Sequence, residues 1–226
     1  MMGLLLGPLL LVAPPIIKVG STTVTLCTAA IVRVQHLGGP GKALPRLVVN
    51  NEWTQPVPHQ VSRNADETTV TTSAVVVSIH SNGTVRFATL GGVPLVTELS
   101  HELEANHSTM VWDSPADEAI YGLGQHNFGF IDYRGAPIPL TQYNLWAAVP
   151  FFVSTRGFGL LWDTSYAVGS FNEPLASERV DFGMYNQSYP CSSCRWGNFT
   201  NATASATFSA ASGEHMIYIE LPTLIW

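Results

Sequence analysis

Hydrophobic and polar residues alternate with a period of two along much of the chain, a pattern typical of β-strands. Residues 22–34 predict one or two strands. Residues 147–154 and 158–162, joined by a Thr-Arg-Gly turn, predict a hairpin that is apolar almost throughout, which indicates strands covered on both faces. Residues 215–221 predict a last strand. No heptad, helical stripe or internal repeat stands out.

A meander is predicted in the first half of the chain. Residues 68–80 form a β-branched run that predicts one long strand. An Asn-Gly turn at residues 82–83 follows, and Asn-Gly between such runs is the strongest short-range hairpin signal. Two glycines at residues 91–92 then reverse the strand of residues 85–90 into residues 93–99. Three strands joined by tight turns form an antiparallel meander.

Other stretches lack a clear period. Residues 121–143 are rich in Gly, Pro, aromatic and amide side chains, and we predict a long loop with strand ends there. Residues 177–205 predict a loose, polar segment. About ten or more short strands without a helix of any length fit an all-β, antiparallel β-sandwich.

Composition narrows the function classes. Hydrophobic residues make up 46% of the 226 residues and charged residues 12%, about half the roughly 25% of ordinary soluble domains. The length accommodates one large domain or two small ones. A net charge of −6 with ten Lys and Arg residues leaves no basic stripe for phosphate groups, so we expect no nucleic-acid partner.

The N-terminus has three interpretations. Residues 3–13 form an apolar run as long as the core of a signal peptide and too short to span a bilayer. The run lacks a basic leader, and Leu-Val-Ala before Pro14 makes a poor cleavage site. A degenerate signal peptide, an imperfect gene start and an apolar leading strand all remain open. We therefore treat residues 1–20 as a leading segment or degenerate signal peptide and residues 21–226 as the domain.

Sequons and cysteines favour a secreted protein. Roughly two Asn-x-Ser/Thr triplets are expected by chance, and the chain has five, at Asn82, Asn106, Asn186, Asn198 and Asn201. Cys191 and Cys194 form a Cys-Ser-Ser-Cys pair, which predicts a local disulfide in a secreted chain or a redox pair in the cytosol. Zinc is the weaker interpretation of that pair because no second pair of ligands completes the site.

Two motifs carry a family resemblance. The first is Tyr-Gly-Leu-Gly-Gln-His at residues 121–126, followed by Tyr-Arg-Gly at residues 133–135. The second is VPFFVSTRGFGLLW at residues 149–162. Together, in this order and spacing, they resemble the N-terminal domain of family 31 glycoside hydrolases, the α-glucosidases and α-xylosidases. Residues 27–34 and 79–95 are similar to earlier strands of that domain. Gln125-His126 and Gln142-x-Asn144 look more like the α-xylosidase branch than the α-glucosidases.

The resemblance implies a galactose-mutarotase-like β-sandwich that packs on a (β/α)8 catalytic barrel of the same chain. In the family, two Asp residues of the barrel carry out retaining hydrolysis as nucleophile and general acid/base, a reaction that needs carboxylates about 5–5.5 Å apart. No stretch matches the segment that holds the nucleophile. We therefore expect a substrate-shaping domain that is inactive alone, has no catalytic residue, metal or cofactor, and associates through the face meant for the barrel.

The resemblance also suggests where sugar is bound. In the family a loop of the sandwich reaches over the barrel mouth and shapes the sugar site, with amides, hydroxyls and aromatic rings as contacts. The matching positions are His126, Asn127, Tyr133, Gln142, Asn144 and Trp146. The alternative is that the aromatic side chains pack the loop while the amides bond its backbone. The partner is thus an oligosaccharide or polysaccharide, with no membrane span expected.

Rival functions have less support. A free-standing lectin-like module would use the same loop. Mutarotase-like acid/base chemistry would pair His126 with Asp132, or His101 with Glu102, but no motif supports either pair. No motif pairs the three acids that are candidates for catalysis, so we expect them to be loop acids: Asp132, Asp163 and Glu173. The Gly-x-Gly pairs lack the third glycine and helix of a dinucleotide site, so turn glycines are expected.

Overall fold

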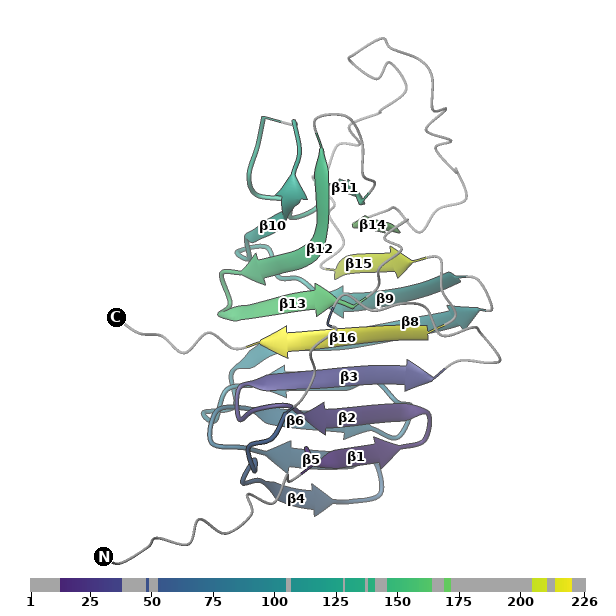
Figure 1. Ribbon diagram of the computed structural model, residues 1–226, viewed down its shortest axis with the longest axis vertical. Helices are drawn as coiled ribbons and strands as arrows, with labels where there is room; N and C mark the ends of the chain where they lie inside the picture. The colour runs from purple at the N-terminus through teal and green to yellow at the C-terminus, as the bar shows by residue number, and fades with distance from the viewer. Residues whose placement is uncertain are drawn as a thin grey trace, which may run out of the picture.

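The chain folds as two β-sheets packed face to face. The computed structural model describes residues 13–37, 48, 53–104, 107–127, 129–136, 138–140, 146–163, 169–171, 205–210 and 214–220. Within these residues every strand pairing is antiparallel, and no helix suited to crossing a membrane occurs. Figure 1 shows one sheet in front of the other. The predicted all-β, antiparallel sandwich is confirmed.

Two sheets account for all sixteen strands of the described residues. In spatial order, the seven-stranded sheet contains β1 (Ile16–Val19), β2 (Thr22–Leu26), β3 (Ile31–Leu37), β16 (Glu214–Glu220), β13 (Phe158–Trp162), β12 (Ala147–Ser154) and β10 (Ile120–Gln125). The nine-stranded sheet contains β11 (Ile138–Leu140), β14 (Gly169–Phe171), β15 (Ser205–Ala210), β9 (His107–Asp113), β8 (Pro94–Glu104), β7 (Val85–Ala88), β6 (Val76–His80), β5 (Glu67–Thr71) and β4 (Gln60–Arg63).

The core lies between the sheets and is rich in aromatic side chains. Trp112 of β9 stacks on Phe152 of β12, with ring centroids 5.6 Å apart and planes 9° from parallel. Phe158 of β13 meets Phe152 edge-on at 5.9 Å. All three side chains are buried, and each such side chain stabilises the fold by about 1.5–3 kcal/mol. The inward positions of the apolar hairpin thus join one sheet to the other.

Several predicted elements are confirmed. The hairpin of residues 147–162 is β12 and β13, and the Asn-Gly turn joins β6 to β7. Gly83 in that turn has a φ of +90°, and a Cβ there would lie 2.9 Å from Thr22 Oγ1, so the position requires glycine. The predicted last strand is β16, which lies between β3 and β13. An early strand, β3, and a late strand, β16, therefore pair in one sheet.

The run of residues 68–80 is two strands, and the prediction of one was wrong. Thr72 interrupts it because its hydroxyl accepts the N–H groups of Ala74 and Val75, both at 3.1 Å. The same hydroxyl donates to the Ala29 carbonyl oxygen at 2.6 Å. This local turn folds β6 back on β5. A threonine whose hydroxyl bonds nearby backbone N–H groups is only a weak indication of a turn in the sequence.

The predicted loop of residues 121–143 is shorter in the structure. Its first part is β10, and its last part contains β11. The alternation of β10 is hidden because its register shifts between Gly122 and Gly124. Strands β1, β4, β14 and β15 were not predicted either. β14 has only three residues, which is too short for a period to be read.

Candidate functional site

The first family motif forms β10, an edge strand that pairs with β12. Across the register shift, Leu123 alone lies between Gly122 and Gly124, whereas three residues of β12, 149–151, lie between their partners, so the extra residues of this irregularity are on β12. Leu123 has a φ of +57°, and its side chain is fully buried. A Cβ on Gly124 would lie 1.8 Å from the Ala147 carbonyl oxygen. The glycines of this motif therefore serve the close approach of two strands.

His126 follows the irregular stretch of β10 and is fixed by it. Its Nε2 atom lies 2.9 Å from the Leu123 carbonyl oxygen, and since a carbonyl only accepts, Nε2 carries the donated proton. The imidazole ring meets Trp146 at 5.7 Å and Tyr133 at 5.9 Å between centroids. Three of the six predicted sugar-site residues thus lie together, with the rings of Trp146 and Tyr133 each packed at a steep angle against the ring of His126.

The other three predicted residues differ from one another. Asn127 is exposed beside this aromatic group. Gln142 and Asn144 lie outside the described residues. His126 and Trp146 are partly exposed, whereas Tyr133 is 5% exposed. His126, Asn127 and Trp146 are therefore accessible at the surface of this loop, while Tyr133 lies buried against the His126 ring.

Tyr133 belongs to the core as well as to the loop. Its backbone N–H donates to the Ile120 carbonyl oxygen at 2.8 Å, and its ring meets Phe130 at 5.7 Å. Burial raises the pKa of its phenol, so the hydroxyl stays protonated at neutral pH. The structure thus gives Tyr133 the packing role that the sequence left as the alternative.

Asp132 and Asp163 bond the backbone. Asp132 Oδ1 accepts the N–H groups of Ile120 at 2.9 Å and Arg134 at 3.0 Å. Asp163 Oδ1 accepts the N–H of Val48 at 3.0 Å. Both carboxylates therefore hold chain segments together. These contacts indicate no acid/base pair between His126 and Asp132 and no other catalytic role for the two acids. Glu173 lies outside the described residues.

A second buried acid, Glu118, is also bonded on both oxygens. The Ser114 hydroxyl donates to Oε2 at 2.7 Å, and the Ser154 hydroxyl donates to Oε1. These bonds tie the link between β9 and β10 to the end of β12. Buried carboxylates need such donors because an unpaired buried charge is strongly unfavourable.

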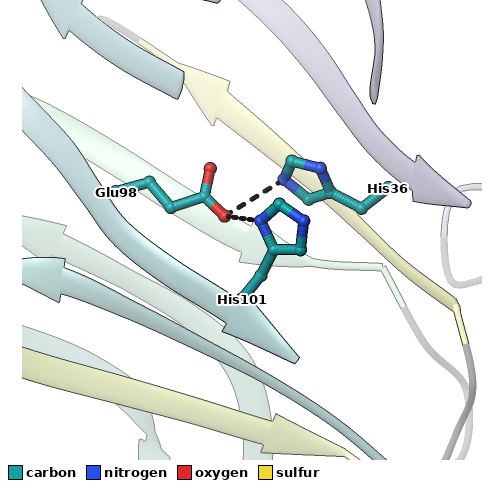
Figure 2. Close-up of side chains that lie close together, drawn as sticks. All are labelled: His36, Glu98 and His101. Carbon is teal, nitrogen blue, oxygen red and sulfur yellow. Dashed lines mark hydrogen bonds and ion pairs between the residues drawn. The ribbon is translucent and has the colours of Figure 1, made fainter. Parts of the chain in front are cut away.

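A different cluster joins the two sheets at their interior (Figure 2). His36 of β3 and His101 of β8 both face one oxygen of Glu98. The distances to Glu98 Oε1 are 3.2 Å from His36 Nε2 and 2.7 Å from His101 Nδ1. The two imidazole rings stack with centroids 4.0 Å apart. The side chains of His36 and Glu98 have no exposed surface, and that of His101 is 13% exposed.

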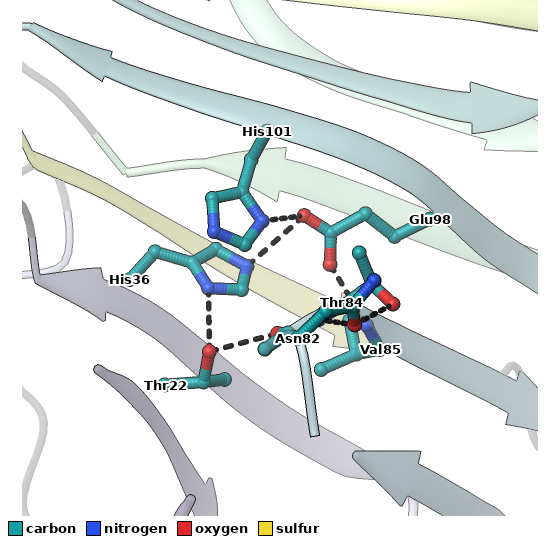
Figure 3. A network of polar contacts seen from close by, with 8 residues as sticks. Thr22, His36, Asn82, Thr84, Val85, Glu98 and His101 are labelled. Carbon is teal, nitrogen blue, oxygen red and sulfur yellow. Dashed lines mark hydrogen bonds and ion pairs between the residues drawn. The ribbon is translucent and has the colours of Figure 1, made fainter. Parts of the chain in front are cut away.

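Further hydrogen bonds surround this cluster (Figure 3). His36 Nδ1 lies 3.0 Å from the Thr22 hydroxyl, which donates to the Gly83 carbonyl oxygen at 2.7 Å. The backbone N–H of Val85 donates to Glu98 Oε2 at 2.8 Å. Burial by itself would raise the pKa of Glu98, but hydrogen bonds from the two histidines and their charges lower it to about 2. Glu98 is therefore a carboxylate at neutral pH.

Sequence reasoning missed this cluster. It considered His101 with Glu102, but Glu102 is exposed and His101 bonds Glu98 instead. Regular alternation would place Glu98 and His101 on opposite faces of β8. A β-bulge between Glu98 and Ser100 turns both inward. No sequence signal marks that bulge, and His36 comes from a distant strand.

Comparison with known proteins decides the family. Residues 21–169 match the model of the glycosyl hydrolase 31 N-terminal galactose mutarotase-like domain. The chain belongs to this family. The resemblance carried by the two motifs is thereby confirmed, together with the galactose-mutarotase-like sandwich.

Relatives of this family 31 domain include α-xylosidases. One from Saccharolobus solfataricus is 33% identical over 84 residues, an alignment that covers 33% of this chain and 11% of the relative. The crystal structure of a family 31 α-xylosidase from Xanthomonas citri is similar with a TM-score of 0.58 and 27% identity, over 73% of this chain and 20% of that one. A soil-metagenome α-xylosidase complexed with xylose shares the fold, with a TM-score of 0.65 and 18% identity over 95% and 32% of the chains.

The family 31 domain is a small part of those proteins. Alignments with the curated relatives cover 10–11% of their length, and those with the two α-xylosidase structures cover 20% and 32% of their chains. In these neighbours the domain is thus one part of a larger enzyme chain.

The remaining predicted sites of this family 31 chain are only partly described. Asn82 is exposed in the β6–β7 turn, where its Oδ1 accepts the Thr84 N–H at 3.0 Å and hydroxyl at 2.8 Å. Asn106, Asn186, Asn198, Asn201, Cys191 and Cys194 lie outside the described residues. Cys27 is a free, buried thiol whose pKa burial raises to about 11, against the lowering effect of Arg33.

Proposed function

We propose that this chain is the substrate-shaping N-terminal domain of a retaining α-glycosidase of the α-xylosidase or α-glucosidase type. The observation that carries the proposal is the family 31 match over residues 21–169, together with the partly exposed aromatic group that the family motif creates beside Asn127. The whole protein would act in carbohydrate metabolism, and its secretion and glycosylation remain part of the same proposal.

In this proposal, a catalytic barrel carries out the hydrolysis and the β-sandwich does not. Retaining hydrolysis needs two carboxylates about 5–5.5 Å apart that flank the glycosidic bond. In the part of the chain that the structure describes, Glu98, Glu118 and Asp163 are buried acids bonded to side chains or backbone of the sandwich. Such fixed carboxylates support the fold, whereas a nucleophile must face the sugar.

The role of the loop is to present the sugar contacts. Trp146 and His126 offer ring surface for the C–H faces of a sugar, and Asn127 offers an amide for its hydroxyls. Tyr133 and the Leu123 carbonyl hold the His126 ring in place, which lowers the entropy that sugar binding must remove.

Kinetics of the complete gene product test this proposal, with aryl α-xylosides and α-glucosides as substrates. Asn127→Ala removes an exposed amide and is expected to lower kcat/KM about three- to tenfold, the loss for one hydrogen bond. Gln60→Ala removes an equally exposed amide on β4, at the far edge of the other sheet, and should leave kcat/KM unchanged.

Hydrolysis by residues 1–226 alone completes the test. We expect no turnover above buffer. Turnover at ordinary enzymatic rates would refute the assignment of the chemistry to a barrel. Tight, saturable binding of xylose- or glucose-containing oligosaccharides by the same polypeptide in titration calorimetry would instead support a self-sufficient binding module.

A further inference from the structure

The cluster of His36, Glu98 and His101 is separate from the sugar loop and has the composition of a metal site. One donor atom from each of the three residues lies within 4.8 Å of the other two. Two imidazole nitrogens and one carboxylate oxygen form the donor set that zinc uses in many proteins. The residues come from both sheets, since His36 lies on β3 while Glu98 and His101 lie on β8.

The β-bulge in β8 brings two of these donors to the same side. Leu99 is the extra residue between Glu98 and Ser100, and its side chain is 51% exposed. Without it, His101 would face away from Glu98. Bulges that re-aim a side chain in this way are over-represented at functional sites. A stable sheet does not require this bulge, but the grouping of Glu98 and His101 does.

Surrounding bonds fix the orientation of the His36 ring. The Thr22 hydroxyl donates to the Gly83 carbonyl oxygen at 2.7 Å, so towards His36 Nδ1, at 3.0 Å, it acts as the acceptor. Nδ1 therefore carries a proton. Nε2 points at Glu98 Oε1, 3.2 Å away, and without a metal ion a proton lies between these two atoms. A bound metal ion would replace that proton and take the Nε2 lone pair.

We propose that His36 Nε2, Glu98 Oε1 and His101 Nδ1 bind one divalent transition-metal ion of the zinc type, which clamps the two sheets together. The inference goes beyond the proposed function and does not depend on sugar binding.

The geometry defines what metal binding requires. Zinc bonds of about 2.0–2.1 Å place tetrahedral ligand atoms roughly 3.3 Å apart. The His36–Glu98 distance of 3.2 Å already fits, while the His101–Glu98 distance of 2.7 Å must lengthen. The two rings lie within 22° of parallel, so His101 must also rotate to direct Nδ1 at the ion. His101 is the partly exposed member of the cluster, and a water molecule on its open side would complete four ligands.

The structure also supplies the second shell of such a site. Zinc-binding histidines usually donate their other ring N–H to a fixed oxygen, which sets the tautomer. Thr22 provides that oxygen for His36, and the Val85 N–H holds the other oxygen of Glu98. Removal of a partner of this kind typically weakens metal binding 10–100-fold.

Zinc titration of the full chain tests the proposal. The chain is treated with chelator and dialysed, and Cys191→Ser and Cys194→Ser are introduced first because thiols also bind zinc. We expect one zinc per chain by calorimetry and elemental analysis. We also expect a rise in Tm of about 5–10 °C when free zinc is a hundred times the Kd.

Variants identify the ligands. His101→Gln, at the partly exposed position, is expected to retain the fold and weaken zinc binding at least about 100-fold, and Thr22→Val about tenfold. His80→Gln is the matched control, because His80 Nδ1 lies 3.6 Å from Glu67 Oε2 in a partly exposed pair elsewhere in the nine-stranded sheet. It should not change zinc affinity.

Two results would overturn the metal site. One is the absence of stoichiometric zinc binding by the folded chain, which would leave the cluster as a hydrogen-bonded imidazole–carboxylate group. The other is zinc binding of equal affinity in the His101→Gln variant. Glycosidase kinetics of the complete gene product would be unaffected by either result, so the two proposals fail independently.

Discussion

Three consecutive residues of β10 have positive φ angles: 117° at Gly122, 57° at Leu123 and 98° at Gly124. For Leu123 the left-handed conformation costs roughly 1–2 kcal/mol. Full burial of its side chain stabilises the fold by about 1.5–3 kcal/mol, which offsets that cost. The positive φ angle of Leu123 therefore persists because the core holds its side chain, and the flanking glycines allow β10 to approach β12. His126 takes its position from the carbonyl group of this same Leu123.

Gly124→Ala tests the close approach. Its Cβ would lie 1.8 Å from the Ala147 carbonyl oxygen, so the strands must separate, and we expect a loss of about 3 kcal/mol or more in the free energy of unfolding. Gly129→Ala is the control, because Gly129 has a φ of +76° but open space around a Cβ. That variant should lose about 1–2 kcal/mol. Equal losses in urea denaturation would show that backbone strain alone matters.

Contacts between elements depend on a few polar side chains inside an apolar interior. Thr22 of β2 bonds the β6–β7 turn of the opposite sheet through the Gly83 carbonyl group, and it bonds His36 on its own sheet. Glu98 of β8 bonds Val85 on β7 and both histidines. These bonds set how β3 and β8 lie across the sandwich, which the apolar core alone does not specify.

Thr22→Val tests this link in metal-free protein. Valine keeps the shape of threonine but removes the hydroxyl, so the Gly83 carbonyl and the His36 Nδ1 group lose their shared partner. We expect a loss of about 1–3 kcal/mol in the free energy of unfolding. Thr23→Val on the same strand, at a half-buried position, should change it by less than about 0.5 kcal/mol. If both variants denature at the same urea concentration, the link contributes nothing.

At the scale of the whole molecule, β12 presents apolar side chains to the outside. Pro150 and Phe152 face the core, so the alternating Val149 and Val153 face outward, and they are 45% and 42% exposed. Related domains in solved structures belong to longer enzymes. An outward apolar strand of this kind suits contact with another part of the protein or with a second copy.

Size-exclusion chromatography of residues 1–226 tests this surface. We expect association that increases with protein concentration, and we expect Val149→Ser with Val153→Ser to restore a monomer. The control pair is Leu90→Ser with Val93→Ser in the β7–β8 connection, where exposure is 56% and 62%. It should leave the association unchanged. A monomeric, soluble parent chain would argue against an interaction face on β12.

The sequence predicted the fold class and much of the meander because alternation and turn residues are local signals. The β12–β13 hairpin and the Asn-Gly turn needed only their own residues. The grouping of His126 and Trp146 followed from the family resemblance. The division of residues 68–80 at Thr72 was missed, because a hydroxyl that captures backbone N–H groups looks like any other threonine in a strand.

By itself, the sequence determined that this protein is an antiparallel β-sandwich with the motifs of a family 31 domain, since strand period and turn chemistry depend on neighbouring residues. Only the tertiary structure decided that Glu98 meets His36 and His101, because one bulge reverses the direction of a side chain and a distant strand supplies the partner. It also decided that Tyr133 is buried while Asn127 is exposed. Contacts of that kind depend on how the two sheets pack, which no local pattern records.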